Sequence, residues 1–304
     1  MQNEAIIVEK QLNFCVIGHP IGHTMSPFIN KRLFALRKEN ADYGVMDIPP
    51  ETLAEQMAVL RTKRGFNVTI PHKQRIIPFL TRLDESARRF GSVNTVCVEE
   101  DGTLTGHTTD GPGCLMALRG RGIRPEGRLL LLGAGGAARA VAFALCEEAS
   151  FLQLTIACRR QSAQKAESLC REIQAYRMSL QKEGTATPAI LEELDGQTEY
   201  DLLLNCTSVG MYPNDGASPV PDRVIARCHA VFDAVYNPHT TRLLQLAEGR
   251  GIPTVHGMDM LVWQAAVAHK YWFGHTFTPD EINGVIEAAV EEMARRFEKK
   301  GANA

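Results

Sequence analysis

The sequence contains no long hydrophobic run and carries almost no net charge. Its 304 residues include 33 Lys and Arg against 35 Asp and Glu, which gives a formal net charge of −2. A chain with this balance has no bulk positive field to attract nucleic acid or a membrane surface. No apolar stretch approaches the roughly 20 residues that a membrane-spanning helix needs, and no basic segment followed by an apolar one suggests a signal peptide. We therefore expect a cytoplasmic protein with neither nucleic acid nor membrane among its partners.

Patterns that would indicate disulfides or metal ligands are also scarce. The eight cysteines include no Cys-x-x-Cys pair, and several fall within expected strands or helices, as reduced core residues do. His19 and His23 are four residues apart, but the proline and glycine between them favour a loop over a helical pair of ligands. We predict no metal site.

A glycine-rich turn in the middle of the chain is the most informative feature that is present. Residues 128–132 form a short apolar run typical of a buried parallel strand, and residues 137–147 have the composition of a helix. Gly133 permits a tight turn, Gly135 lets a pyrophosphate approach the backbone, and Ala138 keeps helix and strand close. An ordinary strand–helix turn is the plainer alternative. We predict a dinucleotide-binding turn made of Gly133, Ala134, Gly135, Gly136, Ala137 and Ala138.

The residues after the next expected strand, 152–158, bear on the choice of cofactor. In a NAD site an acidic residue at this point usually binds the ribose hydroxyls, whereas this chain has Arg159 and Arg160. Guanidinium groups offer paired donors to phosphate oxygens, which suits the 2′-phosphate of NADP. We predict NADP as the cofactor and keep NAD as an alternative.

Expected strands and helices alternate along both halves of the chain, which is typical of an α/β protein. The expected strands after the glycine turn imply right-handed crossovers and a parallel sheet, with a polar loop within residues 179–198. We predict three segments: a mixed α/β substrate domain at 1–112, a Rossmann-like dinucleotide-binding domain at 113–256, and C-terminal helices at 257–304 that pack back on the first domain.

Two polar side chains ahead of the glycine turn are candidates for chemistry. Pro71 should begin a helix with Lys73 in its first turn, where the positive end of the helix dipole favours a neutral amine and hence proton transfer. Asp110 either caps the helix that follows it or holds the lysine ammonium and a substrate hydroxyl. Position alone would equally fit a solvated lysine and a plain cap.

The motifs of the chain, taken together and in order, resemble those of the shikimate/quinate dehydrogenase family, and most closely its shikimate dehydrogenases. Each motif is short, but the set runs along almost the whole sequence. The matching segments are residues 18–27, 67–73, 91–95, 109–111, 133–138, 205–211, 235–238 and 257–264.

The resemblance implies a role for each matching residue. The substrate carboxylate would be bound by Thr24 and Ser26, and closed off by Tyr236. The ring hydroxyls would be bound by Thr69, Lys73, Asn94, Asp110 and Gln264, with Lys73 and Asp110 as the catalytic pair. The nicotinamide side would be lined by Thr207, Ser208, Gly257 and Met258. It further implies oxidation of a CH–OH group in the aromatic amino acid pathway, in a cleft between the domains, by a monomer or homodimer.

The sequence departs from the family pattern near the cofactor. Cys158 replaces a common Asn, Arg160 and Gln161 replace a common Thr, and the spacing to Lys165 is longer, as in the quinate/shikimate branch that also uses NAD. Thr24 and Thr108 replace a common Ser and Asn in the substrate segments. A quinate enzyme with NAD or dual cofactor use is therefore the alternative, and a non-catalytic metabolite sensor is a weaker one.

Overall fold

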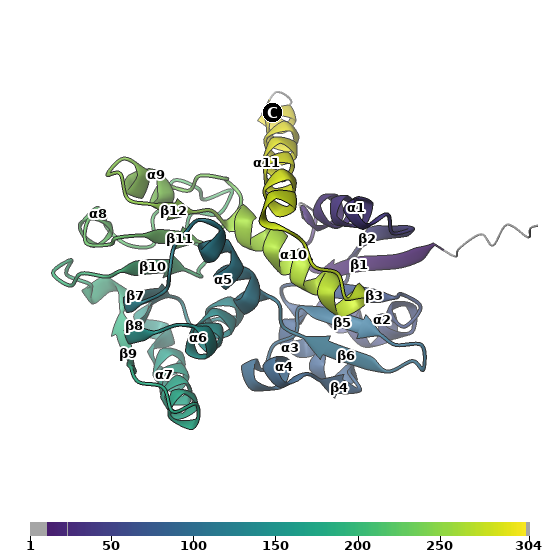
Figure 1. Cartoon of the computed structure of the whole chain (residues 1–304), viewed down its shortest axis with the longest axis horizontal. Helices are drawn as coiled ribbons and strands as arrows, with labels where there is room; N and C mark the ends of the chain where they lie inside the picture. Colours follow the sequence, from purple (N-terminus) through teal and green to yellow (C-terminus); the bar gives the residue numbers. More distant parts are fainter. Residues whose placement is uncertain (1–10, 23, 302–304) are drawn as a thin grey trace, which may run out of the picture. The chain divides into compact units, whose positions relative to one another are not determined.

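The computed structural model describes residues 11–22 and 24–301, without the side chains of 297–301, so that His23 lies outside the described residues. The described chain divides into two compact units, whose elements are labelled in Figure 1. Unit 1 runs up to His107 and adds Ala268–Thr276. Unit 2 contains Thr108–Val267 and the chain from Phe277 onward.

Unit 1 is built on a mixed sheet of six strands in the order β2-β1-β3-β5-β6-β4. β1 pairs in parallel with β2 and β3, whereas β5 is antiparallel to both β3 and β6. The strands are β1 (Leu12–Gly18), β2 (Ala41–Asp47), β3 (Gly65–Val68), β4 (Arg82–Leu83), β5 (Thr95–Val98) and β6 (Leu104–His107). The predicted mixed α/β domain is confirmed, and β5 and β6 form a hairpin within it.

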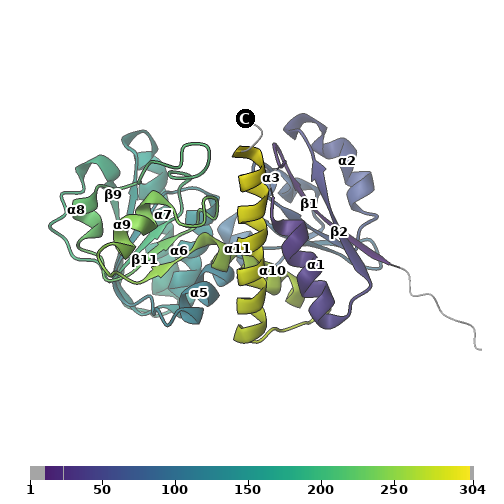
Figure 2. The same cartoon turned by 90° about the horizontal axis from the view of Figure 1, so that it is seen from above.

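The helices of unit 1 bury apolar side chains against this sheet. α1 lies beside β1 and β2, as Figure 2 shows. The helical elements are α1 (Ser26–Arg37), η1 (Pro50–Thr52), α2 (Leu53–Leu60), α3 (His72–Arg75), η2 (Ile77–Phe79) and α4 (Glu85–Phe90). The last part of α10 (Gly257–Phe273) also belongs here: Trp272 donates from Nε1 to the carbonyl of Val96 at 3.1 Å. A Cβ on Gly65 would collide with that indole, so only glycine allows this packing.

Unit 2 is built on a parallel sheet of six strands in the order β12-β11-β10-β7-β8-β9. The strands are β7 (Gly127–Leu132), β8 (Phe151–Cys158), β9 (Thr185–Ile190), β10 (Leu202–Asn205), β11 (Val231–Asp233) and β12 (Thr254–Val255). The four leucines of β7 are fully buried, as a central parallel strand requires. The predicted parallel-sheet domain is confirmed.

One strand of unit 2 contradicts the sequence-based prediction. Residues 179–198 were expected to contain a polar loop, and no strand was predicted among them, but Thr185–Ile190 form β9 at the edge of the sheet. An edge strand needs few apolar side chains and tolerates a proline, here Pro188, because one row of its backbone groups has no strand to pair with. The composition of residues 185–190 therefore does not indicate a strand.

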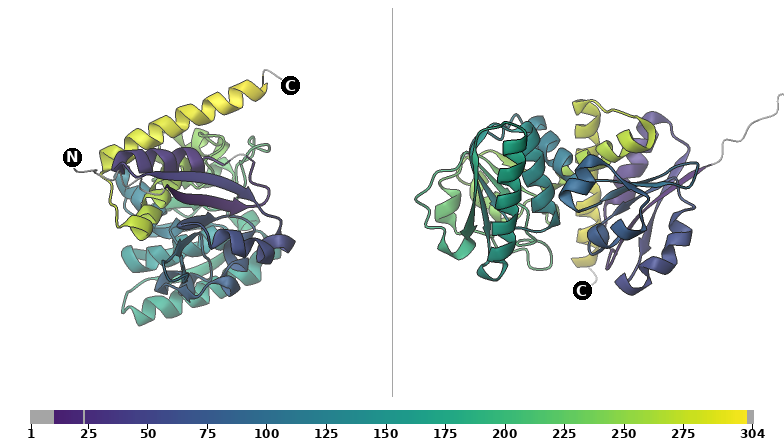
Figure 3. Two further views of the ribbon diagram at one scale, coloured as in Figure 1. Left: turned by 90° about the vertical axis from the view of Figure 1, so that its right-hand side faces the viewer. Right: turned by 90° about the horizontal axis from the view of Figure 1, so that it is seen from below.

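The helices of unit 2 cover its sheet and end in one long helix. They are α5 (Asp110–Gly120), α6 (Gly136–Glu148), η3 (Arg160–Ser162), α7 (Ala163–Ser179), η4 (Leu191–Glu193), α8 (Asp222–Ile225), α9 (Arg242–Glu248) and α11 (Pro279–Gly301), with the first part of α10. α11, the yellow helix of Figure 3, is unbroken. Its buried apolar side chains are Ile282, Val285, Ile286, Ala289 and Met293.

Candidate functional site

In unit 1, two predicted hydroxyls lie side by side in the segment between β1 and α1. Thr24 donates from Oγ1 to the Ser26 hydroxyl at 3.0 Å and accepts from the Ser26 N–H at 3.1 Å. Ser26 is the first residue of α1, and both side chains are half-buried. The pair therefore shapes the turn and also presents two neighbouring hydroxyl groups, as the binding of a carboxylate would require.

Three more predicted residues of unit 1 are joined through their backbones. The carbonyl of Asn94 accepts from the N–H of Val68, directly before Thr69, at 2.8 Å. The carbonyl of Lys73 accepts from the N–H of Val93, directly before Asn94, also at 2.8 Å. The end of β3, the start of α3 and the segment before β5 thus form one unit, which brings Thr69, Lys73 and Asn94 together.

The helix that carries Lys73 is shorter than expected. α3 contains only four residues, His72–Arg75. A single turn aligns few peptide dipoles, so the predicted contribution of a helix field to the chemistry of Lys73 is small. The turn is instead anchored by His72, which is fully buried and places Nε2 2.6 Å from the carbonyl oxygen of Ile48.

Asn67 was missing from the predicted site although it begins the motif at 67–73. Its side-chain oxygen accepts from the Tyr43 hydroxyl at 2.5 Å, and its amide donates to the Asn94 carbonyl at 3.1 Å and the Thr95 hydroxyl at 3.0 Å. Thr95 in turn donates to the side-chain oxygen of Asn94 at 3.2 Å. This network orients the buried Asn94. In the sequence, only its place at the start of the motif at 67–73 could have indicated Asn67 as part of the site.

In unit 2, Asp110 is buried at the start of α5, but it does not cap the helix. The N-cap is Thr109, without a capping side-chain bond, and Asp110 is the first helical residue with 5% of its surface exposed. Of the two roles that the sequence left open for Asp110, the cap is therefore wrong. Buried carboxylates are rare without a specific function or partner.

The glycines that flank Asp110 explain how α5 is held. A Cβ on Gly111 would lie 2.5 Å from the carbonyl oxygen of Ala140 in α6, and one on Gly113 would lie 2.8 Å from the Cβ of Gln264 in α10. α5 therefore packs backbone-close between these two helices. The Thr109 hydroxyl also faces the side-chain oxygen of Gln264 at 3.4 Å. The structure thus brings Asp110 and Gln264 into the same part of unit 2.

The glycine-rich turn has the conformation that the sequence predicts. Gly133 follows β7 with φ of +106°, a conformation that favours glycine, and Ala138 is fully buried in α6. Gly135 differs, because among the described residues a Cβ placed there would meet no atom within 4 Å apart from its chain neighbours. Its bare backbone just before α6 therefore fits the close approach of a pyrophosphate.

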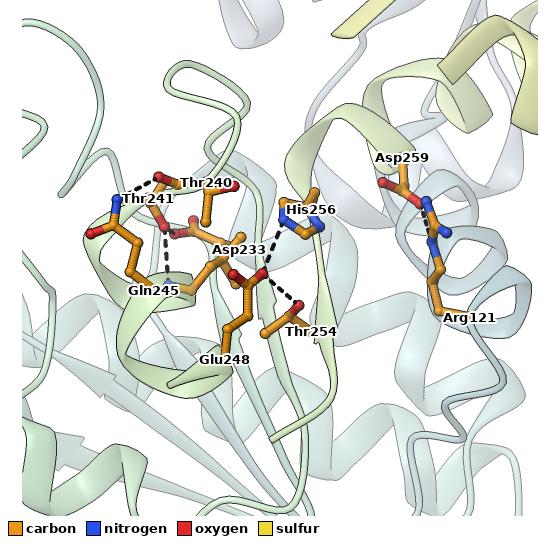
Figure 4. Close-up of polar contacts among 10 residues, drawn as sticks. Arg121, Asp233, Thr240, Thr241, Gln245, Glu248, Thr254, His256 and Asp259 are labelled. Carbon is orange, nitrogen blue, oxygen red and sulfur yellow. Dashed lines mark hydrogen bonds and ion pairs between the residues drawn. The ribbon is translucent and has the colours of Figure 1, made fainter. Parts of the chain in front are cut away.

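A buried network holds the segment after β10. Asp233, at the end of β11, accepts from the Asn205 amide at 2.8 Å, the Val235 N–H at 3.0 Å and the Thr241 hydroxyl at 2.6 Å. Figure 4 shows Asp233 beside Thr241. The side-chain oxygen of Asn205 then accepts from the N–H and the hydroxyl of Thr207, at 3.0 and 2.7 Å. Sequence reasoning missed this support for Thr207 and Ser208.

Burial raises the pKa of Asp233 from 3.8 to about 6, against the opposing effect of its three hydrogen bonds. A carboxyl with a raised folded-state pKa holds its proton more tightly when folded. The resulting stability is fully present below about pH 4 and is lost as the pH rises to about 6. In D233N this titration is absent. We expect the stability advantage of the wild type over D233N to shrink by about 3 kcal/mol between pH 4 and pH 7, measured by urea unfolding; an unchanged advantage would contradict the assigned pKa.

The start of α10 is fixed by close packing and by an ion pair. A Cβ on Gly257 would lie 2.5 Å from the carbonyl group of Val235, and Met258 is fully buried. The next residue, Asp259, accepts from Nε of Arg121 at 2.6 Å, as Figure 4 shows. At this point of α10 the backbone of Gly257 therefore packs directly against that of Val235, and the Met258 side chain points into the protein.

Two histidines stack beside this segment. The rings of His239 and His256 are 4.3 Å apart and nearly parallel. Burial lowers the pKa of both imidazoles, and the neighbouring His256 lowers that of His239 further. Tyr236 lies three residues before His239, and burial raises the pKa of its hydroxyl. The predicted carboxylate-binding tyrosine is thus protonated and can donate a hydrogen bond.

The two arginines after β8 lie in different surroundings. Arg159 lines an open pocket of about 600 Å³ that also includes Leu191, Glu192, Val209 and Arg242. Arg160 is not among the lining residues; it forms an ion pair with Glu193. The prediction assigned both guanidinium groups to the cofactor, whereas in the structure only that of Arg159 lines the pocket.

Within the described part of the chain, no group of three His, Cys, Asp or Glu side chains is arranged to hold a metal ion. Among the same residues, no helix is long and apolar enough to cross a membrane.

Together, these features define an α/β protein with a dinucleotide-binding unit and a second unit in which hydroxyl and amide side chains cluster. A family model described as the shikimate dehydrogenase substrate binding domain matches residues 16–96. A "Shikimate dehydrogenase (NADP(+))" of Symbiobacterium thermophilum is 40% identical over 280 residues, which cover 91% of this chain and 94% of the relative. The chain belongs to the shikimate dehydrogenase family.

Solved structures agree with this assignment. Shikimate 5-dehydrogenase from Thermus thermophilus, in complex with NADP(H) and shikimate, is 35% identical with a TM-score of 0.79 and covers 91% of this chain and 99% of its own. The Listeria monocytogenes enzyme, in complex with shikimate and NAD, is 30% identical with a TM-score of 0.80, covering 93% and 98%. The two-domain α/β fold predicted from the sequence is confirmed by these relatives.

Proposed function

We propose that this protein is a shikimate dehydrogenase that interconverts shikimate and 3-dehydroshikimate with NADP, a step of chorismate and aromatic amino acid biosynthesis. The observation that carries the proposal is the combination, in one chain, of a matched substrate-binding domain at 16–96 with a parallel-sheet unit whose glycine turn is open at Gly135. The residues present fit the cofactor, because the space beside Gly135 that a Cβ would occupy is open to a pyrophosphate.

Lys73 is the proposed proton-transfer residue. NADP supplies the hydride chemistry when bound. In the oxidative direction, Lys73 accepts the proton of the substrate C3 hydroxyl while the C3 hydrogen leaves as hydride, so that the C–O bond becomes a carbonyl. In the reductive direction, Lys73 donates that proton to the ketone oxygen. The backbone bond from Val93 to Lys73 supports this role, because it fixes the turn that carries the amine.

The other site residues are proposed to bind and orient the substrate. Thr24 and Ser26 supply hydroxyl donors for its carboxylate, and the protonated Tyr236 supplies another. Thr69, Asn94, Asp110 and Gln264 bind the ring hydroxyls, with Asp110 orienting the lysine amine. Thr207, Ser208, Gly257 and Met258 line the nicotinamide side. These residues contribute to catalysis mainly by orienting the substrate, because groups that are already oriented lose little further translational and rotational entropy in the transition state.

The second candidate is an enzyme of the quinate/shikimate branch that uses NAD. The observation that favours it is the ion pair of Arg160 with Glu193, which leaves only one of the two arginines after β8, Arg159, at the pocket. Quinate carries an additional hydroxyl at C1, next to the carboxylate that Thr24 and Ser26 would bind. The methyl group of Thr24 reduces the space there relative to serine, which favours shikimate.

Steady-state rates with shikimate and quinate, each with NADP⁺ and NAD⁺, distinguish the candidates. We expect kcat/KM for shikimate with NADP⁺ to exceed each other combination at least about tenfold, equivalent to roughly 1.4 kcal/mol of binding discrimination. A preference for quinate or for NAD⁺ would favour the second candidate. The absence of turnover in all four combinations would contradict both and favour a sensor.

A further inference from the structure

Arg160 and Glu193 meet because two parallel strands end side by side. Cys158 of β8 pairs in register with Ile190 of β9. The short helix η3 begins with Arg160, two residues after Cys158, and η4 ends with Glu193, three residues after Ile190. The side chains are 72% and 59% exposed, so the ion pair lies at the surface. It therefore forms at the carboxyl end of the sheet, where ligands of such folds bind.

Arg159 has no such partner. Among the described residues, its guanidinium makes no hydrogen bond or ion pair, and it lines the 600 Å³ pocket. Asp222 lines the same pocket, but its carboxylate is bound by Arg250, with one distance of 3.0 Å from Nε. The pocket, which Glu192 and Arg242 also line, thus holds in Arg159 an arginine without an ion-pair partner among the described residues, while the neighbouring Arg160 is paired with Glu193.

We propose that Glu193 limits the selectivity of this protein for NADP over NAD, because it holds Arg160 in an ion pair and leaves Arg159 as the main guanidinium for the ribose 2′-phosphate. This inference rests on the proposed function, since it presumes a dinucleotide site at the end of β8. A phosphate and a carboxylate compete for the same forked donors. The 2′-phosphate of NADP can bind Arg160 only by displacing Glu193. The affinity for NAD, which lacks that phosphate, does not depend on the ion pair.

The size of the effect follows from the exposure of the pair. Exposed ion pairs contribute little, and their loss typically changes an equilibrium by a factor of up to about five. Removing the charge of Glu193 should therefore improve 2′-phosphate binding by roughly two- to fivefold. Removing Arg159, a charge-assisted donor at the pocket, should weaken it by about tenfold or more.

The test uses 2′,5′-ADP and 5′-AMP, which differ only in the 2′-phosphate, and measures their Kd by calorimetry on the full chain. The variants are E193Q, R160Q, the double variant and R159Q. E148Q is the matched control, because Glu148 forms another surface ion pair, with Arg119, that involves neither β8 nor β9. Melting temperatures verify that each variant is folded.

We expect E193Q to bind 2′,5′-ADP two- to fivefold more tightly than the wild type, with 5′-AMP and E148Q unchanged. The gain should disappear in the double variant, and R160Q alone should have little effect. An unchanged Kd in E193Q, a gain that persists without Arg160, or a loss of 5′-AMP binding in E193Q would overturn the inference. If the wild type binds both ligands equally, the NADP assignment itself fails; if 2′,5′-ADP is preferred but E193Q is neutral, only the role of Glu193 fails.

Discussion

Replacing Lys73 with alanine should lower kcat for shikimate oxidation by about 10²- to 10⁴-fold, the range that general acid–base catalysis contributes. The Kd for NADP should change little, because the glycine turn and Arg159 belong to the other unit. The fold of unit 1 should also persist, since Lys73 fixes its turn through its backbone carbonyl, which alanine retains. Steady-state kinetics and cofactor titration measure the two effects separately.

Two further variants separate proton transfer from charge. K73R keeps a cation but cannot release its proton in a protein, so it should be nearly as inactive as the alanine variant. K63A removes another lysine of unit 1 and should leave kcat unchanged. A K73A enzyme with more than about a tenth of the wild-type kcat would contradict the assignment, because so small a loss is below that of a general base.

Replacing Gly135 with valine should abolish cofactor binding while leaving the protein folded. A Cβ at this position meets no protein atom within 4 Å, and φ of −86° is accessible to any residue. The added methyl groups would instead occupy the path of the pyrophosphate. We expect the Kd for NADP to rise by at least about 100-fold, the loss of roughly 3 kcal/mol, with a change in melting temperature of only a few degrees.

The contrasting variant is G133A. Here φ is +106°, and a Cβ would lie 3.2 Å from Thr207 and 3.3 Å from the carbonyl of Cys206. The substitution should therefore lower stability as well as binding. If G135V loses stability as G133A does, the glycine at 135 serves the fold, and the proposed approach of the pyrophosphate loses its support.

The strands that sequence predicted well are those buried on both faces. The leucines of β7 and the apolar run of β8 are recognisable in the sequence because a central parallel strand has no polar face. β9 was missed because its edge position removes that constraint, and its polar residues and Pro188 are those of a loop. The two residues of β4 are too few to give any pattern.

The site was predictable in its residue types but not in its connections. The motif at 67–73 gave Thr69 and Lys73, yet the bond from Asn67 to Asn94 joins segments 27 residues apart and has no local signal. The same holds for Asp233, which reaches Asn205 across two neighbouring strands. Arg159 and Arg160 look equivalent in sequence, and only the distant Glu193 distinguishes them.

The close approach of α5 to α6 and α10 has a consequence for how this protein would respond to random mutation. Gly111 and Gly113 have no side chains and, in this account, contact neither substrate nor cofactor. A saturation screen for activity would nevertheless find both as intolerant as Asp110, because any side chain there displaces the helix that begins with the carboxylate. Intolerance to substitution would thus mark three residues, Asp110, Gly111 and Gly113, of which only the first is needed for chemistry.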